Sequence, residues 1–166
     1  MIQVLVMGVC GVGKSTIGRQ LANSLDAQFL DADDFHSKEN QAHMSMGLAL
    51  NDETRKPWLM AVVAALNRFV VSGERVVLAC SALKQEYREI LLASCPNSQV
   101  VFLHADESLI RSRLRQRTGH FAAESLLKTQ LETLEEPEDA IWIKITPLMT
   151  VARSTNLTLS LLRIDK

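Results

Sequence analysis

Short, continuous apolar runs alternate along this chain with longer segments in which apolar residues recur every three or four positions. A continuous apolar run is typical of a strand buried on both faces, and the longer spacing is typical of a helix with one buried face. The runs predict strands at residues 2–7, 28–30, 75–79, 100–103 and 141–145. The periodic segments predict helices at residues 14–25, 57–71, 84–93, 106–117 and 123–134, with a short helix within 38–50 and a last helix after Pro147.

Strands that alternate with helices form a parallel sheet with right-handed crossovers and helices on both faces. The sequence therefore predicts a three-layer α/β/α fold around a five-stranded parallel sheet. The length of 166 residues suits a single domain, 1–166, and we find no repeat or linker that divides it. Ligands of such sheets bind at the carboxyl ends of the strands, so we expect the chemistry in segments that directly follow strands.

The segment after the first predicted strand matches the pattern G-x-x-x-x-G-K-[ST]. Between a strand and a helix, such a loop directs several backbone N–H groups at one phosphate, and the helix dipole adds to them. Lys14 is placed to reach the β- and γ-phosphates, and the Ser15 hydroxyl to ligate Mg²⁺. The alternative is an ordinary strand–turn–helix corner, which the flanking pattern disfavours. The sequence thus predicts a P-loop that binds ATP through Gly8, Val9, Cys10, Gly11, Val12, Gly13, Lys14, Ser15 and Thr16.

Two aspartates, Asp31 and Asp33, follow the second predicted strand in the sequence LDADDFH. Side chains two positions apart point in the same direction along an extended chain. Near a phosphate loop, one carboxylate can hold Mg²⁺ or its water, while the other orients an acceptor hydroxyl and takes its proton. The alternative is a turn in which the aspartates cap backbone N–H groups. His36, by itself, is as often a capping or surface residue as a functional one.

Two cations are candidates for binding an acidic substrate. Arg55 precedes the helix predicted from Pro57, and its planar guanidinium suits a carboxylate. Lys84 stands at a helix start after the third predicted strand, where free N–H groups also favour an anion. The alternative is that both cations are solvated. Trp58 is interpreted as a core residue.

A polar segment at about 118–137 is a candidate for a mobile lid. The helix before it carries Arg111, Arg113, Arg115 and Arg117. Because helix positions four apart share a face, Arg113 and Arg117 form a pair that the other two arginines do not join. A lid would exclude water from ATP and bring an arginine onto the transferring phosphoryl group. The alternative is a solvated helix with scattered charge.

The overall composition excludes several other classes of protein. Hydrophobic residues make up 47% and charged residues 22% of the chain, as in ordinary globular proteins, and the net charge of −1 argues against a nucleic acid or membrane partner. No apolar run of membrane-spanning length is present, and the N-terminus lacks the basic start of a signal peptide. Three cysteines without a C-x-x-C pair indicate reduced thiols in a cytoplasmic protein.

Five segments together carry a resemblance to one family. They read MGVCGVGKS, DADDFHSKENQAHMSMGLALNDETRKPWL, CSALKQEYR, RTGHF and LEEP. Over residues 4–137 the chain resembles the gluconokinases, small P-loop kinases related to shikimate kinase and the nucleoside monophosphate kinases. This resemblance implies a P-loop NTPase fold, phosphorylation of D-gluconate at its 6-hydroxyl by ATP with Mg²⁺, and a homodimer.

The resemblance also implies roles for individual residues. The catalytic set is Lys14, Asp33 as the base, and Arg117. The metal would be served by Ser15 and Asp31. Arg113 joins the P-loop residues in the ATP-binding set and would lie near the nucleotide base. A segment at about 34–72 is the substrate-binding segment. The substrate contacts are Asp33, His36, Arg55, Lys84 and, from the lid, His120.

The chain departs from the family pattern at His43, Ala49, Thr54, Ala122 and Leu131, and by a small change at Ala32, where the family has glycine. These departures leave the P-loop and the predicted substrate residues intact, and bear on substrate preference and lid packing. Two rival hypotheses are a P-loop kinase for another hydroxylated acid, shikimate-like or a different sugar acid, and a nucleotide-binding regulator without catalysis. A regulator would have lost Asp33 or the lid arginines, and both are present.

Overall fold

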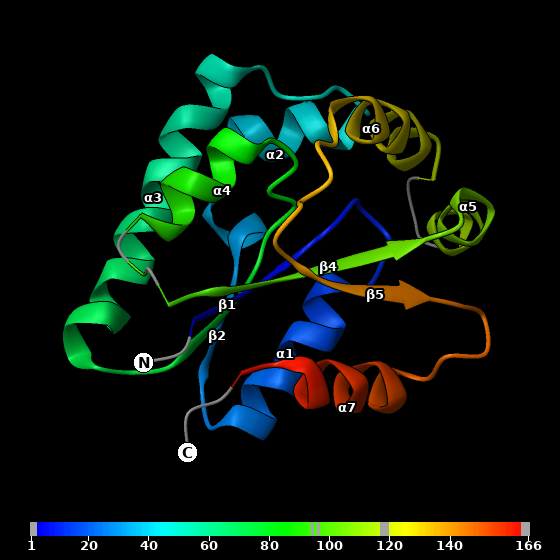
Figure 1. Cartoon of the computed structure of the whole chain (residues 1–166). Helices are drawn as coiled ribbons and strands as arrows, with labels where there is room; N and C mark the ends of the chain where they lie inside the picture. Colours follow the sequence, from blue (N-terminus) through cyan, green and yellow to red (C-terminus); the bar gives the residue numbers. More distant parts are fainter. Residues whose placement is uncertain (1–2, 94, 96, 117–119, 164–166) are drawn as a thin grey trace.

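The structure, a computed structural model, describes the chain except for residues 1–2, 94, 96, 117–119 and 164–166. Five strands alternate with helices in the described part (Figure 1). In chain order the elements are β1 (Gln3–Met7), α1 (Lys14–Leu25), β2 (Gln28–Asp31), the 3-10 helix η1 (Ala32–Phe35), α2 (Lys38–Ser45), α3 (Asp52–Ser72), β3 (Val76–Ala79), α4 (Gln85–Leu92), β4 (Gln99–Ala105), α5 (Glu107–Arg115), α6 (His120–Thr133), β5 (Ile141–Ile145) and α7 (Val151–Leu161).

All five strands are parallel and lie in the order β2-β3-β1-β4-β5. Strand β1 is central and contributes to both faces of the sheet, because successive side chains of a strand point to opposite sides. Val4 and Val6 pack in one core cluster with α1 and α7, whereas Leu5 and Met7 pack in another with α3 and α4 (Figure 1). The predicted three-layer fold is therefore confirmed.

The helix predicted from Pro57 begins earlier, at Asp52, and the prediction of its start was wrong. The side chain of Asn51 caps it by accepting a hydrogen bond from the Thr54 amide at 2.8 Å. Pro57 falls in the second turn, where a missing N–H removes a single hydrogen bond near the helix end. Arg55 consequently lies within α3 and not in front of it.

Most of the remaining predicted boundaries agree with the structure within one or two residues, but α6 begins three residues earlier than predicted, at His120. The ranges of α1 and β5 are those predicted, whereas β4 extends two residues further than expected, to Ala105. Ile2, predicted to start the first strand, and Arg117, predicted to end the fifth helix, lie outside the described residues. Among the helices that the structure describes, none has the length and apolar character needed to cross a membrane.

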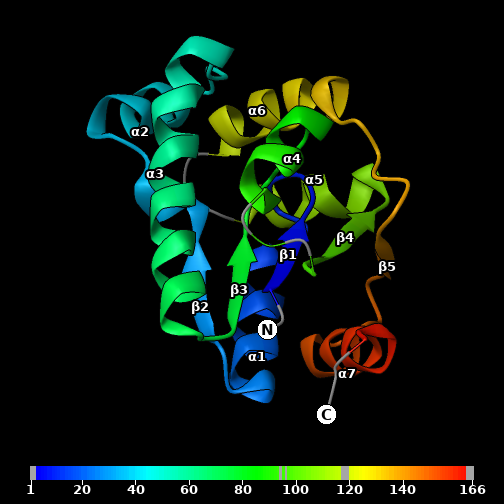
Figure 2. The same cartoon turned by 60° about the vertical axis from the view of Figure 1, so that its left-hand side comes forward.

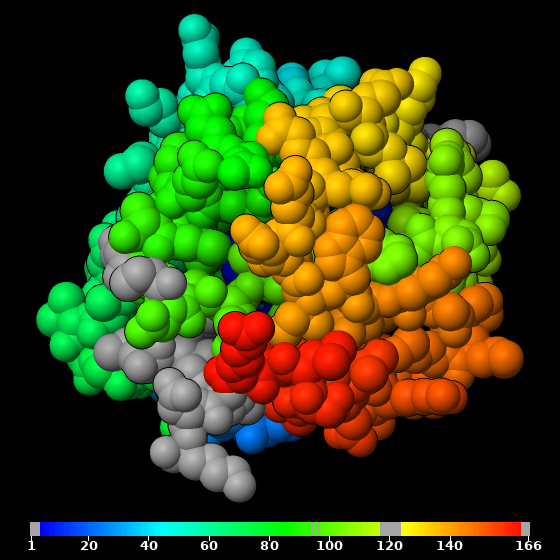
Figure 3. Space-filling model, viewed as in Figure 1, coloured from blue at the N-terminus to red at the C-terminus, as the bar shows by residue number. Residues whose placement is uncertain are grey.

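Helices and connecting segments cover the edge of the sheet at which the strands have their carboxyl ends (Figure 2). In Figure 2, the arrowheads of β2 and β3 point toward α2 and α6, which lie beyond this edge. The segment after α6 returns to the start of α4, where the Glu135 amide donates to the Leu83 carbonyl at 2.9 Å, and the two segments lie against each other in Figure 3. Helices α2 and α6 thus stand over the strand ends.

Candidate active site

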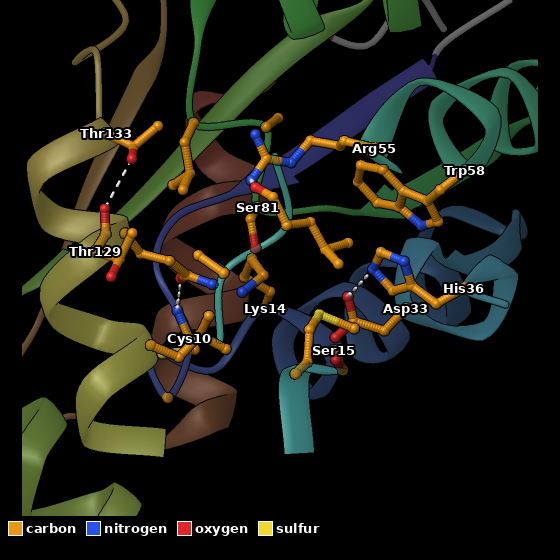
Figure 4. A pocket seen from close by; sticks show the side chains of 18 of the residues that line it. Cys10, Lys14, Ser15, Asp33, His36, Arg55, Trp58, Ser81, Thr129 and Thr133 are labelled. Atoms are coloured by element: carbon orange, nitrogen blue, oxygen red, sulfur yellow. Dashed lines mark hydrogen bonds and ion pairs between the residues drawn. The ribbon is translucent and has the colours of Figure 1, made fainter. Parts of the chain in front are cut away.

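A cavity of about 570 Å³ opens at the carboxyl ends of the strands. Its walls come from the P-loop, the turn after β2, α2 with the start of α3, the β3–α4 connection, and α6 (Figure 4). Segments that are far apart in sequence therefore meet here, as expected for a parallel sheet.

The P-loop is shaped by glycines whose conformations other residues rarely adopt. Gly8 has a φ of 139°, and a side chain there would overlap the carbonyl oxygen of Leu103. Gly13, with a φ of 114°, ends the loop at the N-cap of α1. The Lys14 ammonium donates to the Val9 carbonyl at 3.1 Å. Lys14 and Ser15 line the cavity, so the start of α1 with its free N–H groups faces the space where phosphates would bind.

The two predicted aspartates are separated by the structure. Asp31 is the N-cap of η1, and its Oδ1 accepts a hydrogen bond from the Asp33 amide at 3.2 Å. The expectation of an extended chain with parallel carboxylates was wrong, because this cap turns the chain directly after β2. Asp33 lines the cavity together with Lys14 and Ser15. Asp31 thus caps η1 through Oδ1, and Asp33 is the aspartate that lines the cavity.

His36 lies flat against Trp58 on the wall of the cavity. The ring centroids are 4.5 Å apart with an interplanar angle of 10°, and Trp58 Nε1 donates to the Ala32 carbonyl at 2.6 Å. Burial lowers the pKa of His36, against the opposing effect of Asp33, whose carboxylate lies 4.0 Å from Nε2. His36 is therefore neutral at neutral pH. Trp58 is buried, as predicted, and also lines the cavity.

Arg55 and Lys84 meet at the carboxylate of Asp52, which no sequence argument had anticipated. Lys84 Nζ is 2.8 Å from Asp52 Oδ2, and Arg55 NH1 is 3.4 Å from Oδ1. Tyr87 joins this group, because its hydroxyl donates to Asp52 and accepts from Arg55 at 2.7 Å. The hydrogen bond from Lys84 lowers the pKa of Asp52. Arg55 and Tyr87 line the cavity, whereas Lys84 stands outside its lining.

The arginines of α5 divide between the P-loop and α6. Arg113 donates to the Val12 carbonyl at 3.1 Å, so it lies against the P-loop. Arg111 and Arg115 both pair with Glu124 of α6, at 3.5 and 2.6 Å. Arg117 lies outside the described residues, and only the backbone of His120 is described, so the predicted lid contacts of both remain predictions.

The far end of α6 is tied to the start of α4 by a buried arginine. Arg88 is 6% exposed, and its NH1 donates to the carbonyls of Ala82, Leu83 and Glu135 at 3.0, 3.2 and 3.0 Å. The Glu135 carboxylate in turn accepts from the Gln85 amide at 2.6 Å. The position of α6 relative to the cavity is thus set at this end by hydrogen bonds to backbone groups.

Tyr87 and Gln130 are among the residues of the cavity wall that sequence reasoning missed. Tyr87 lies three residues after Lys84, on the next helical turn, so the helix predicted there contained the signal. Gln130 of α6 contacts the P-loop: its Oε1 accepts from the Cys10 amide at 2.7 Å, and the dashed line at Cys10 in Figure 4 marks this bond. These partners are 120 residues apart, and no local sequence pattern predicts a contact over such a separation.

A P-loop at the carboxyl edge of a five-stranded parallel sheet, facing a carboxylate and an arginine across one cavity, defines a P-loop kinase for small molecules. A family model described as Shikimate kinase matches residues 10–159. The fold and the cavity residues thus agree with the class that this match covers.

The similarity extends to proteins of one particular activity. A probable gluconokinase of Rattus norvegicus is 47% identical over 152 residues, covering 81% of this chain and 82% of that protein. A gluconokinase of Arabidopsis thaliana is 40% identical over 160 residues, covering 89% and 85%. The crystal structure of a gluconokinase from Sinorhizobium meliloti 1021 superposes with a TM-score of 0.83 at 40% identity, covering 95% and 89% of the two chains. The chain belongs to the gluconokinase family.

Proposed function

We propose that the protein transfers the γ-phosphoryl group of ATP to the 6-hydroxyl of D-gluconate, yielding ADP and 6-phospho-D-gluconate. The observation that carries this proposal is a single cavity with Lys14 and Ser15 in one wall and Asp33 and Arg55 in others. Such a cavity can receive a nucleotide and an acid together. The gluconokinase names of the similar proteins indicate which acid.

On the donor side, the P-loop amides and the Lys14 ammonium bind the β- and γ-phosphates and neutralise the charge that builds up during transfer. Arg113 packs on the loop at Val12. In this proposal it lies near the nucleotide base. Arg117 and His120 act from the lid segment, 118–137, which closes over ATP and keeps water out. Transfer to gluconate then competes with no attacking water.

The donor atoms near the P-loop fit Mg²⁺. This ion prefers oxygen ligands and keeps several waters, so a kinase needs few protein ligands besides the phosphates. Among the described residues, no group of three His, Cys, Asp or Glu forms a dedicated metal cage. Ser15 and Asp31 would hold the ion, and it would supply positive charge to the β- and γ-phosphates.

On the acceptor side, Asp33 orients the 6-hydroxyl and accepts its proton as the new O–P bond forms and the bond to ADP breaks. Arg55 binds the gluconate carboxylate with its guanidinium. Lys84, which shares the partner Asp52 with Arg55, is the second cation that binds the substrate. Neutral His36, held against Trp58, contacts the substrate hydroxyls from the segment 34–72.

We also propose that residues 1–166 act as one domain, that the protein is a homodimer and that it works in the cytoplasm. The shared core around β1 supports the first proposal. The family resemblance supports the second. The three cysteines support the third, because all of them are free thiols, as is usual in a reducing compartment.

The proposal is tested by coupled assays of ADP release with gluconate, idonate, shikimate, glycerate and nucleoside monophosphates as acceptors. We expect turnover with gluconate far above the background ATPase, and kcat/KM for shikimate lower by at least about 1,000-fold, because an unmatched acceptor leaves buried polar groups unpaired. Equal rates with and without gluconate would refute the proposal. A preference for another acid would redefine the substrate and leave the kinase class intact.

A further inference from the structure

Gln130 occupies an unusual position for a side chain within the proposed lid segment. It lies on α6, and its Oε1 accepts a hydrogen bond of 2.7 Å from the amide of Cys10 within the P-loop. Both residues line the cavity, together with Lys14 and Asp33. Gln130 thus brings the helix of the lid segment, α6, into direct contact with the phosphate-binding loop.

The bond to Cys10 also determines which way the Gln130 amide points. Its partner is a backbone N–H, which can only donate, so the oxygen of the amide must face the loop. The Nε2 group, with two N–H donors, therefore faces away from the loop. Within the part of the chain that the structure describes, Nε2 of Gln130 has no hydrogen-bond partner, and the residue lines the cavity. Its donors are available to a ligand there.

The neighbouring hydroxyls on α6 are already engaged within the helix. Thr133 donates to the Thr129 carbonyl at 2.8 Å, and Thr129 donates to the Ser125 carbonyl at 3.4 Å. Both threonines line the cavity beside Gln130. Gln130 therefore differs from these threonines, because its polar hydrogens are not used within α6.

The location of the amide indicates which part of a bound molecule it meets. Lys14, the residue that reaches the β- and γ-phosphates in a P-loop, donates to the carbonyl of Val9, directly before Cys10. The Lys14 ammonium and the Gln130 amide consequently contact adjacent residues of the same loop. The space between them and Asp33 is where the γ-phosphoryl group and the acceptor hydroxyl would meet.

We propose that Gln130 is a catalytic residue that donates a hydrogen bond from Nε2 to an oxygen of the transferring phosphoryl group, while Oε1 is anchored on the Cys10 amide. This inference rests on the proposed kinase function. Charge moves onto the phosphoryl oxygens and the leaving group during transfer, and a donor fixed in advance stabilises that charge without reorganisation. The ties of Arg88 to Glu135 hold the end of α6 and so help to fix the donor.

The substitution Gln130→Glu separates the two ends of the amide. A glutamate keeps an oxygen that accepts from the Cys10 amide, but replaces the Nε2 donors by a second oxygen. We expect kcat with ATP and gluconate to fall by about 100-fold, as on removal of one transition-state donor, with the KM values and the affinity for ADP changed less than about threefold. The matched control is Glu132→Gln, at an exposed position of the same helix, which should retain wild-type kinetics.

The wild-type assay comes first, because absence of gluconate turnover would refute the proposed function and not the role of Gln130. With an active wild type, unchanged kcat in Gln130→Glu would overturn the inference, since the anchoring contact alone would then suffice. If that variant does not fold, Gln130→Met distinguishes a donor role of Gln130 from a role in shaping the loop. A fall in kcat of tenfold or more at unchanged KM for ATP supports the donor role, whereas a raised KM for ATP at unchanged kcat overturns it by showing that Gln130 only shapes the loop.

Discussion

The two sides of the cavity are built in different ways. The P-loop is continuous in sequence and packed into the core, with Val9 and Val12 buried on either side of its glycines. The acceptor side is assembled from η1, α2, α3 and α4, and α2 contains no buried residue. Its charged groups are positioned by contacts among themselves. Asp52 forms ion pairs with Arg55 and Lys84 and accepts a hydrogen bond from Tyr87.

This difference suggests how such a fold changes its substrate without losing its donor. A loop that binds through backbone amides has few side chains to vary, and its glycines are constrained by sterics, as Gly8 is by Leu103. A site assembled from side chains of several segments can be altered one residue at a time. The departures from the family pattern at His43, Ala49 and Thr54 fall on the acceptor side, in agreement with this view.

The largest expected effect comes from removing the cation of the P-loop. We expect Lys14→Ala to lower kcat by about 1,000-fold or more, because the charge on the γ-phosphate loses its main side-chain partner. The fold should persist, since Lys14 contributes a single hydrogen bond to Val9. Steady-state kinetics and a thermal melt measure both. Activity near that of the wild type would argue against a phosphate role.

Asp33→Asn should give the next largest loss. We expect kcat to fall by about 100- to 1,000-fold, because the amide cannot take the proton of the acceptor hydroxyl, while KM for ATP stays nearly constant. Asp34→Asn, at the exposed neighbouring position, is the control and should behave as wild type. Loss of ATP affinity at normal kcat would instead reverse the roles that we assign to Asp31 and Asp33.

Arg55→Ala should affect the acceptor side alone. We expect KM for gluconate to rise by about 30-fold, the effect of losing one charged hydrogen-bond partner, with KM for ATP unchanged. Arg68→Ala, at an exposed position on the same helix, provides the control for a lost arginine. Equal rises in both KM values would show that Arg55 serves the site as a whole.

The smallest expected effect concerns stability and pH. Because burial lowers the pKa of His36 below its ordinary value of 6.5, the unfolded chain binds more protons than the folded one as the pH falls from that value. The free energy of unfolding should therefore decrease on acidification, at most by about 1.4 kcal/mol per pH unit from this residue. Denaturant unfolding of wild type and His36→Gln between pH 7.5 and 5 measures it, and parallel slopes would contradict the prediction.

Much of the fold could be predicted from the sequence, because apolar periodicity and the glycine pattern are local signals. The boundaries of α1 and β5 and the three-layer order followed from them. The start of α3 did not, since Pro57 resembled a first-turn proline and the cap at Asn51 lay further upstream. The geometry of Asp31 and Asp33 also failed to follow, because a side-chain cap overrode the extended conformation.

The sequence by itself determined the P-loop, its flanking strand and helix, and the residue types that face a phosphate. These depend on neighbours in the chain, whose contacts are set by backbone geometry. Only the tertiary structure decided that Asp52 joins Arg55 to Lys84, and that Gln130 reaches Cys10 from α6. Such contacts join residues separated by 32 and 120 positions, and they depend on the sheet, which brings these segments together at its carboxyl edge.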